Sequence, residues 1–189
     1  MTTLIFYKPY DVVSRFTDDG DAVTLAAFID MTGVYPAGRL DKDSEGLLLL
    51  TDDGRLAHHI TDPKHHLLKV YLAQVERVPD EAALERLRRG VMIGGRMTRP
   101  AGAELLGTEP ELPPRPVPIR YRKSVPTAWI RVTLREGMNR QVRRMTAAIG
   151  HPTLRLVRIG EGPLTLEGLS PGMWREASGQ EVRALWGKT

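Results

Sequence analysis

The 189-residue chain contains no cysteine and no long apolar run. Without cysteine it can form neither disulfides nor thiolate nucleophiles, and a zinc site could not use thiolate ligands. Its apolar runs are only a few residues long, as at Leu47–Leu50, whereas a membrane-spanning helix needs about 20 such residues. The amino terminus has no basic region before its apolar residues, unlike a signal peptide. We therefore expect a soluble, cytoplasmic protein without membrane contact.

Acidic residues are nearly absent between Leu112 and Gly160, where eleven Lys or Arg residues accompany one acid. The rest of the chain has 16 basic and 22 acidic residues, so the net charge of +4 hides a strong asymmetry. A concentrated positive field is typical of proteins that bind polyanions, because each neutralised phosphate releases counterions. RNA or DNA is therefore the favoured partner class. Charge alone leaves open a solvated basic face in a chain that uses 21 Arg and 6 Lys.

Strand-like and helix-like patterns are mixed along the chain without a regular βα repeat. The expected strands are residues 4–7, 47–50, 70–76, 128–134 and 153–159, and residues 119–123 are expected to form a hairpin with 128–134. The expected helices are Thr24–Met31, Asp80–Arg89, Arg140–Ile149 and a closing helix that begins at Ser178. This mixture predicts an α+β architecture in a single folded unit.

The loop that precedes Leu47–Leu50 carries the residues best suited to chemistry. It places the carboxylate of Asp41 between Arg39 and Lys42, and it leads into a strand that should be buried. Nearby cations favour the ionised form of a carboxyl group, which keeps it ready as a nucleophile or base. Asp43 lies in the same loop, so the residues alone leave open a helix cap, a solvated charge or a hydrolase that uses Asp41 and Asp43 as a pair.

The expected helix Arg140–Ile149 combines an apolar stripe with a basic face. The stripe consists of Met138, Val142, Met145 and Ile149, spaced four, three and four residues apart. Arg140, Arg143 and Arg144 fall together off this stripe. We therefore expect one face to be buried and another to present guanidinium groups.

Two other patterns predict no cofactor. His58-His59 and His65-His66 are adjacent pairs whose side chains point in different directions, and no organised carboxylates complete a metal site. Gly160-Glu161-Gly162 lacks the third glycine of a dinucleotide fingerprint and does not open a helix of a βαβ unit. We expect neither a metal nor an organic cofactor.

The loop Gly38–Thr51 resembles, almost residue for residue, the catalytic loop of the RsuA group of pseudouridine synthases, with the pattern G-R-L-D-x-x-S/T-x-G-L-L-L-L-T. Further correspondences occur in the order of that family and extend over essentially the whole chain. They are Lys8-Pro9, Lys69 with Tyr71, Glu136-Gly137, Gln141 to Met145, and Arg158 to Gly160.

The resemblance implies an enzyme that isomerises a uridine of ribosomal RNA to pseudouridine without a cofactor. It implies Asp41 as the catalytic carboxylate, Tyr71 as a ring that packs on the target base, and Arg143 as the partner of Asp41. Arg39, Lys42, Arg140 and Arg144 are assigned more loosely to RNA binding. A tyrosine in the core and a phosphate contact are the alternatives for Tyr71 and Arg143, respectively.

The family also implies a mixed, mostly antiparallel sheet flanked by helices, with two lobes around a basic cleft, which we place at residues 1–66 and 67–189. Among the subtypes the chain looks most like one that acts on the large ribosomal subunit, because Lys8-Pro9 comes too early for a preceding S4 domain. We expect a monomer that acts on ribosomal RNA or on a ribosomal assembly particle. A non-catalytic rRNA-binding or assembly factor on the same fold is the alternative.

Overall fold

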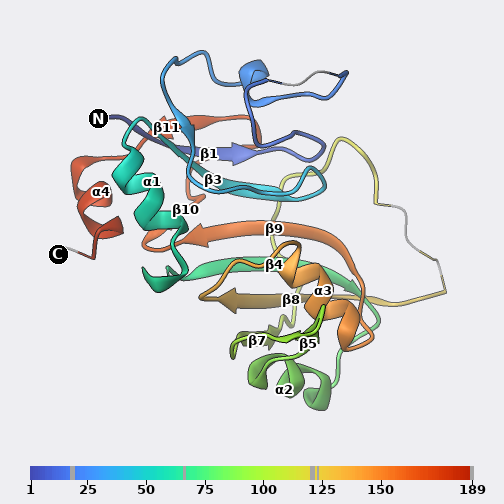
Figure 1. Cartoon of the computed structure of the whole chain (residues 1–189). Coiled ribbons are helices and arrows are strands. Elements are labelled where there is room, and N and C mark those ends of the chain that lie inside the picture. Colours follow the sequence, from blue (N-terminus) through green and yellow to red (C-terminus); the bar gives the residue numbers. More distant parts are fainter. Residues whose placement is uncertain (18–19, 66, 120–121, 123, 188–189) are drawn as a thin grey trace. The chain divides into compact units, whose positions relative to one another are not determined.

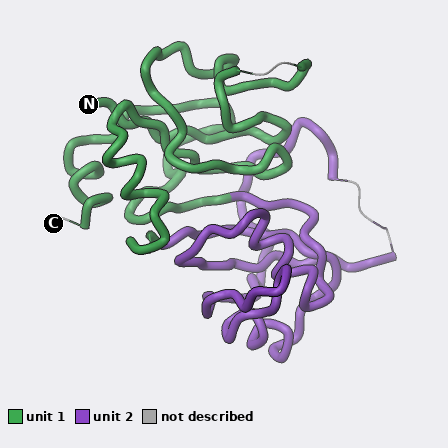
Figure 2. The backbone as a smooth tube through the Cα atoms, viewed as in Figure 1, with its two compact units in different colours: residues 1–67, 158–189 green, residues 68–157 purple. Residues whose placement is uncertain are grey.

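A computed structural model describes the chain except residues 18–19, 66, 120–121, 123 and 188–189 (Figure 1). The chain forms two compact units, which Figure 2 shows in different colours. Unit 1 comprises residues 1–67 and 158–189, and unit 2 comprises residues 68–157. These units differ from the expected lobes 1–66 and 67–189, because strand β9 (Thr153–Glu161) starts in unit 2 and ends in unit 1.

Unit 1 is built on an antiparallel sheet. Its strands are β1 (Thr3–Lys8), β2 (Tyr35–Pro36), β3 (Glu45–Thr51), β10 (Leu164–Thr165) and β11 (Trp174–Glu176). Its helices are α1 (Gly54–Thr61), α4 (Gly179–Leu185) and two short 3-10 helices, Leu25–Ala27 and Pro63–His65. The strand order is β11-β1-β3, and β9 follows β3.

Both faces of this sheet are covered by apolar side chains. Successive residues of a strand point to opposite faces. Accordingly, Leu48 and Leu50 join one apolar cluster with Leu4 and Phe6, while Leu47 and Leu49 belong to a second cluster with Ile5, Leu56 of α1 and Leu185 of α4. The four consecutive leucines are therefore a strand buried on both sides, as the sequence predicted.

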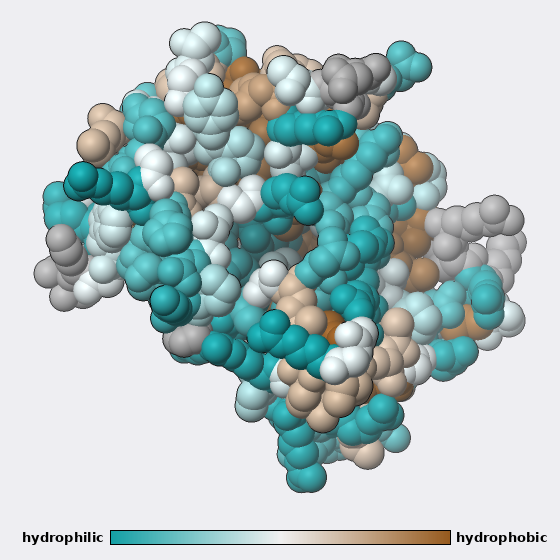
Figure 3. All heavy atoms as spheres, viewed as in Figure 1, coloured by the Kyte–Doolittle hydropathy of each residue, from teal (hydrophilic) through white to brown (hydrophobic). Residues whose placement is uncertain are grey.

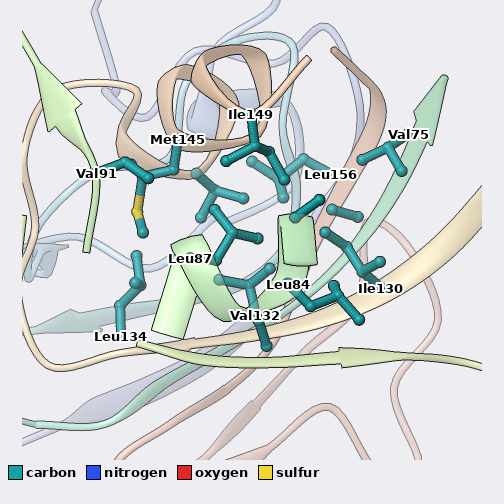
Figure 4. Packing of buried hydrophobic residues seen from close by; sticks show 14 of the residues in the cluster. Val75, Leu84, Leu87, Val91, Ile130, Val132, Leu134, Met145, Ile149 and Leu156 are labelled. Atoms are coloured by element: carbon teal, nitrogen blue, oxygen red, sulfur yellow. The ribbon is translucent and has the colours of Figure 1, made fainter. Parts of the chain in front are cut away.

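Unit 2 contains three whole strands of the main sheet, the first part of β9, a separate hairpin and two helices. The elements are β4 (Lys69–Glu76), α2 (Glu81–Arg89), β5 (Met92–Ile93), β6 (Arg96–Met97), β7 (Gly102–Leu105), β8 (Thr127–Leu134) and α3 (Gln141–Ala148). The order is β4-β8-β7, with β9 on the other side of β4. Leu84 and Leu87 of α2 and Met145 of α3 point into one apolar cluster over these strands, together with Ile149 just after α3 (Figure 4).

The mixture of helices with a mainly antiparallel sheet confirms the expected α+β class. Two of the helix starts are also as predicted, those of α2 and α4. Asp80 caps α2 through the Ala83 amide, and Ser178 and Glu181 form a capping box at α4. The expected helix Thr24–Met31 is wrong: only Leu25–Ala27 is helical, and the Thr24 side chain caps no amide there. The expected hairpin strand 119–123 lies largely outside the described residues.

Hydrophilic residues cover most of the face drawn in Figure 3, and hydrophobic residues form smaller patches on it. Among the helices of the described residues, none is long and apolar enough to span a membrane.

Candidate active site

Asp41 lies in unit 1 on the loop of residues 37–44, which joins β2 to β3. It is half-buried, and its carbonyl oxygen accepts a hydrogen bond from the Ser44 amide at 3.0 Å, which closes a turn. Arg39 and Lys42 beside it are exposed, whereas Leu40 is buried in an apolar cluster of unit 1. Asp41 is thus the first residue of this turn, and Leu40, directly before it, is anchored in the core.

Ser14 holds the residue before Asp41 through both of its backbone polar groups. The Ser14 hydroxyl donates to the Leu40 carbonyl oxygen at 2.7 Å and accepts from the Leu40 amide at 3.1 Å. A serine hydroxyl has one proton and two lone pairs, so it can make both bonds at once. Leu40 is therefore fixed by its backbone and by its buried side chain.

Asp11 holds the residue after Asp41. Its amide donates to the Lys42 carbonyl oxygen at 2.9 Å, and its carboxylate lies 3.3 Å from the Lys42 ammonium. The ion pair is about half exposed and contributes little, so the backbone hydrogen bond is the firmer contact. Asp11 adopts φ 67°, a left-handed conformation that Asp tolerates better than most residues. Residues 40 and 42 are thus both held by the segment 11–14.

Lys8 organises that segment from inside the protein. Its fully buried ammonium donates to the carbonyl oxygens of Pro9 at 2.9 Å and Val12 at 2.7 Å. Burial lowers the pKa of Lys8 from its usual 10.5 to about 8, because the charged form is desolvated. Four nearby carboxylates oppose this shift: Glu45, Asp43, Asp41 and Asp11. Lys8 therefore supplies a positive charge that acts on the acids of the Asp41 loop.

The strand that follows the loop depends on a close approach to β9. Gly46 has φ 112°, and a Cβ placed on it would lie 2.2 Å from the Arg158 carbonyl oxygen, so no other residue fits without moving the backbone. The buried Arg158 side chain donates from Nε to the Leu47 carbonyl oxygen at 2.7 Å and pairs with buried Glu161 at 3.2 Å. The sequence alone indicates no role for Glu161; in the structure it is the counter-ion of Arg158.

Tyr71 lies in unit 2, in β4, opposite Val132 of β8. It is half-buried and packs against the apolar cluster of that unit. Tyr71 therefore contacts the core, as expected for the alternative of a core tyrosine, while part of the residue is still exposed. Base stacking by Tyr71 stays a prediction.

The three arginines near α3 occupy different environments, which corrects the expectation of one shared face. The helix begins at Gln141, and Arg140 precedes it as an exposed residue in a left-handed conformation, φ 50° and ψ 37°. Arg143 is half-buried and donates from Nη1 to the Thr153 carbonyl oxygen at 3.3 Å. The guanidinium of Arg144 lies against Gly94. Because the backbone reverses its twist at Arg140, that side chain does not follow the helical spacing.

A buried polar network positions the start of α3. Glu136 accepts hydrogen bonds from the Arg99 amide at 2.9 Å and from the Gln141 side-chain amide. The Gln141 oxygen in turn accepts from the Met138 amide at 2.8 Å. Glu136 and Gln141 thus close the loop that contains Arg140. In the sequence they are recognisable only as part of the family motif.

The described residues contain no group of three or more His, Asp and Glu side chains arranged to hold a metal ion. His59 instead stacks on Trp186 and His65, with ring centroids 4.6 and 3.8 Å apart, and its Nε2 lies 3.1 Å from the Leu185 carbonyl oxygen. His66 lies outside the described residues. Ring packing between α1, the 3-10 helix Pro63–His65 and Trp186 at the end of α4 therefore accounts for His59 and His65.

Comparison with known proteins gives a consistent result over nearly the whole chain. The sequence pattern of the family described as RNA pseudouridylate synthase matches residues 2–148. Ribosomal large subunit pseudouridine synthase E of Vibrio vulnificus is 53% identical over 93% of this chain and 74% of its own length. The protein of the same name from Xanthomonas campestris pv. campestris is 52% identical over 95% of this chain and 97% of its own.

Among solved structures, a crystal structure of a pseudouridylate synthase superposes with a TM-score of 0.80 at 30% identity. The match covers 97% of this chain and 73% of the other.

Lys8 gives a prediction for the pH dependence of stability. The folded protein releases the Lys8 proton near pH 8, whereas the unfolded chain keeps it until about 10.5. Between these values the unfolded state binds more protons, so the Lys8 contribution to the free energy of unfolding rises with pH, by about 3 kcal/mol in all. Conversely, this contribution decreases as pH falls from about 10.5 and is lost once pH has fallen through 8.

Urea unfolding of wild type and Lys8→Met between pH 7 and 10.5 measures this contribution, since the variant lacks the group. The difference in unfolding free energy should shift in favour of the wild type as pH rises. A difference that stays constant over this range would show that Lys8 titrates as it does in an unfolded chain.

Proposed function

The chain belongs to the RNA pseudouridylate synthase family and is an RNA pseudouridine synthase; we propose that it isomerises a uridine of large-subunit ribosomal RNA with Asp41 as its catalytic carboxylate. The names of the relatives from Vibrio and Xanthomonas support the ribosomal substrate. The observation that carries the assignment of Asp41 is its backbone setting. Ser14 holds Leu40 before it, and Asp11 holds Lys42 after it.

The proposed reaction rearranges one nucleoside without net gain or loss of atoms. The bond from N1 of the base to C1′ of the ribose breaks, the base turns, and a bond from C5 to C1′ forms. C5 loses a proton, and N1 carries one in the product, so no oxidant or reductant is consumed. A positioned carboxylate can stabilise the detached sugar or base covalently or electrostatically. We propose no cofactor for this chemistry.

Asp41 suits this task because a carboxylate acts well only when its position is fixed before the substrate arrives. Misplacement of a catalytic group by about 1 Å costs on the order of a hundredfold in rate. The hydrogen bonds on both sides of Asp41 restrict the backbone from which the carboxylate projects. The buried ammonium of Lys8 lies close enough to Asp41 for the two charges to attract each other.

Tyr71 and Arg143 are proposed to act on the same uridine as Asp41. The Tyr71 ring would stack on the target base, and its hydroxyl would assist proton transfer; its partial exposure in β4 supports this. The Arg143 guanidinium would pair with the Asp41 carboxylate, which it would both orient and keep ionised. The motif positions of both residues support these roles.

Exposed cations are proposed to hold the RNA backbone. Arg39, Lys42 and Arg140 are exposed and Arg144 is half-buried, and such side chains are generic phosphate ligands. They would bind ribosomal RNA, either free or in an assembly particle, around a uridine flipped out of its stack. Parallel assays on transcribed 23S rRNA and on isolated assembly particles separate these two substrates.

Asp41→Asn should abolish pseudouridine formation while leaving folding and RNA affinity near wild type, because the amide keeps the shape and loses the charge. The measurement is single-turnover conversion of transcribed 23S rRNA, followed by pseudouridine mapping. Asp43→Asn is the matched control, since Asp43 is a half-buried acid on the same loop. Its conversion rate should stay within about threefold of wild type, a loss of less than 1 kcal/mol of transition-state stabilisation.

Near wild-type conversion by Asp41→Asn would remove Asp41 from the chemistry. An equally large loss in Asp43→Asn would instead favour a pair of carboxylates. If wild-type protein binds the RNA but forms no pseudouridine in either substrate, the non-catalytic alternative holds.

Arg143→Gln should lower the single-turnover rate by orders of magnitude and leave the salt dependence of RNA binding almost unchanged, because its proposed partner is a carboxylate and not a phosphate. Arg143→Lys should also be impaired, since a point charge cannot replace a planar two-pronged contact. Arg140→Gln is the comparison. It should reduce the slope of log affinity against log salt by about 0.7 to 0.9 without slowing chemistry at saturating RNA.

The pairing of Asp41 with Arg143 must be abandoned if Arg143→Gln behaves like Arg140→Gln in both assays.

A further inference from the structure

The hairpin of β5 and β6 turns through two consecutive glycines. Gly94 and Gly95 have φ 57° and 78°, the left-handed pair that a tight two-residue hairpin requires. The hairpin forms its own two-stranded sheet in unit 2, with Ile93 opposite Arg96. Figure 1 shows β5 next to α3.

The two glycines differ in what surrounds them. A Cβ placed on Gly94 would lie 2.2 Å from Nη2 of Arg144, whereas a Cβ on Gly95 would have nothing within 4 Å. Turn geometry alone accounts for Gly95. At Gly94 the missing side chain also leaves the space in which the Arg144 guanidinium lies.

Arg96 lies on the same face of the hairpin as α3. Residues directly opposite each other in an antiparallel pair point to the same side, so Arg96 shares the face of Ile93. Ile93 is buried in the cluster that contains Val142 and Met145 of α3. The exposed Arg96 and the half-buried Arg144 therefore border one side of the hairpin.

This side carries two positive charges, those of Arg96 and Arg144. No acid occurs between Gly90 and Gly102. Within the part of the chain that the structure describes, neither Arg96 nor Arg144 has an ion-pair partner. A guanidinium that is half-buried and held in place keeps exposed N–H groups that can donate to an anion. Two guanidinium groups with no acid between them suit a phosphate, which accepts paired hydrogen bonds.

We propose that Arg144 and Arg96 form a binding site for backbone phosphate of the RNA substrate, and that Gly94 positions Arg144 in it. The site rests on the proposed function for its ligand, RNA. It adds the β5–β6 hairpin to the RNA-binding surface and gives Gly94 a role beyond that of a turn residue.

The glycines supply a matched pair of variants. Gly94→Ala and Gly95→Ala strain similar left-handed positions, but only the first displaces the Arg144 guanidinium. Affinity for a transcribed 23S rRNA fragment, measured by fluorescence anisotropy over a range of KCl concentrations, should fall several-fold for Gly94→Ala and stay near wild type for Gly95→Ala. Arg144→Gln and Arg96→Gln should each reduce the slope of log affinity against log salt by about 0.7 to 0.9.

The combination Gly94→Ala with Arg144→Gln tests the link between the two residues. It should bind RNA no more weakly than Arg144→Gln alone, because the group that Gly94→Ala displaces is already gone. Equal effects of the two alanine variants, or an undiminished effect of Gly94→Ala in the Arg144→Gln protein, would overturn the role of Gly94. Unchanged slopes for both arginine variants, which do not touch the turn, would overturn the site.

Pseudouridine formation by the wild-type protein on the same RNA is measured in parallel. If it is absent while the binding results are as expected, the proposed function fails and the phosphate site stands. If pseudouridine forms and the binding results are negative, only the site is lost.

Discussion

The hydrogen bonds between Ser14 and Leu40 are the constraint on which the proposed active site depends. One hydroxyl satisfies both backbone groups of the residue before Asp41, at 2.7 and 3.1 Å. Leu40 also buries its side chain in the core, so the peptide that carries Asp41 cannot rotate without breaking apolar and polar contacts together. The Asp11 amide also holds Lys42, so the proposed catalytic carboxylate is fixed although it lies on a loop and not on a helix or strand.

Two buried cations, Lys8 and Arg158, hold the backbone around the Asp41 loop, and burying them costs desolvation energy. Lys8 satisfies the carbonyl oxygens of the segment that contains Asp11, and Arg158 satisfies the Leu47 carbonyl oxygen in the strand after the loop. Buried ion pairs such as Arg158 with Glu161 are weak evidence for net stability, because desolvation offsets much of the attraction. Removing one partner leaves a buried charge, however, so each cation restricts the chain to one local conformation.

The sequence predicted what depends on local pattern. The strand through Leu47–Leu50, the caps at Asp80 and Ser178 and the α+β class follow from periodicity and capping chemistry, and the structure confirms them. It did not predict contacts between distant segments. Ser14 and Leu40 are 26 residues apart in the sequence, and Arg158 and Leu47 are 111 residues apart, yet each pair is hydrogen-bonded. Gly94 and Arg144 are likewise distant in the sequence and adjacent in the structure. Arg140 lies outside the helix in a left-handed conformation, in the loop between buried Glu136 and Gln141, which hydrogen-bond to each other, and residue spacing cannot reveal this.

The most direct test of the central claim, that the hold on Leu40 positions Asp41 for chemistry, is the single-turnover rate of Ser14→Ala on transcribed 23S rRNA, measured beside its RNA affinity. We expect a rate at least tenfold below wild type at saturating RNA, with unchanged affinity. Ser14→Thr should recover most of the rate, and Ser170→Ala, which changes an exposed serine, should have no effect. A Ser14→Ala protein that is folded and forms pseudouridine at the wild-type rate would contradict it.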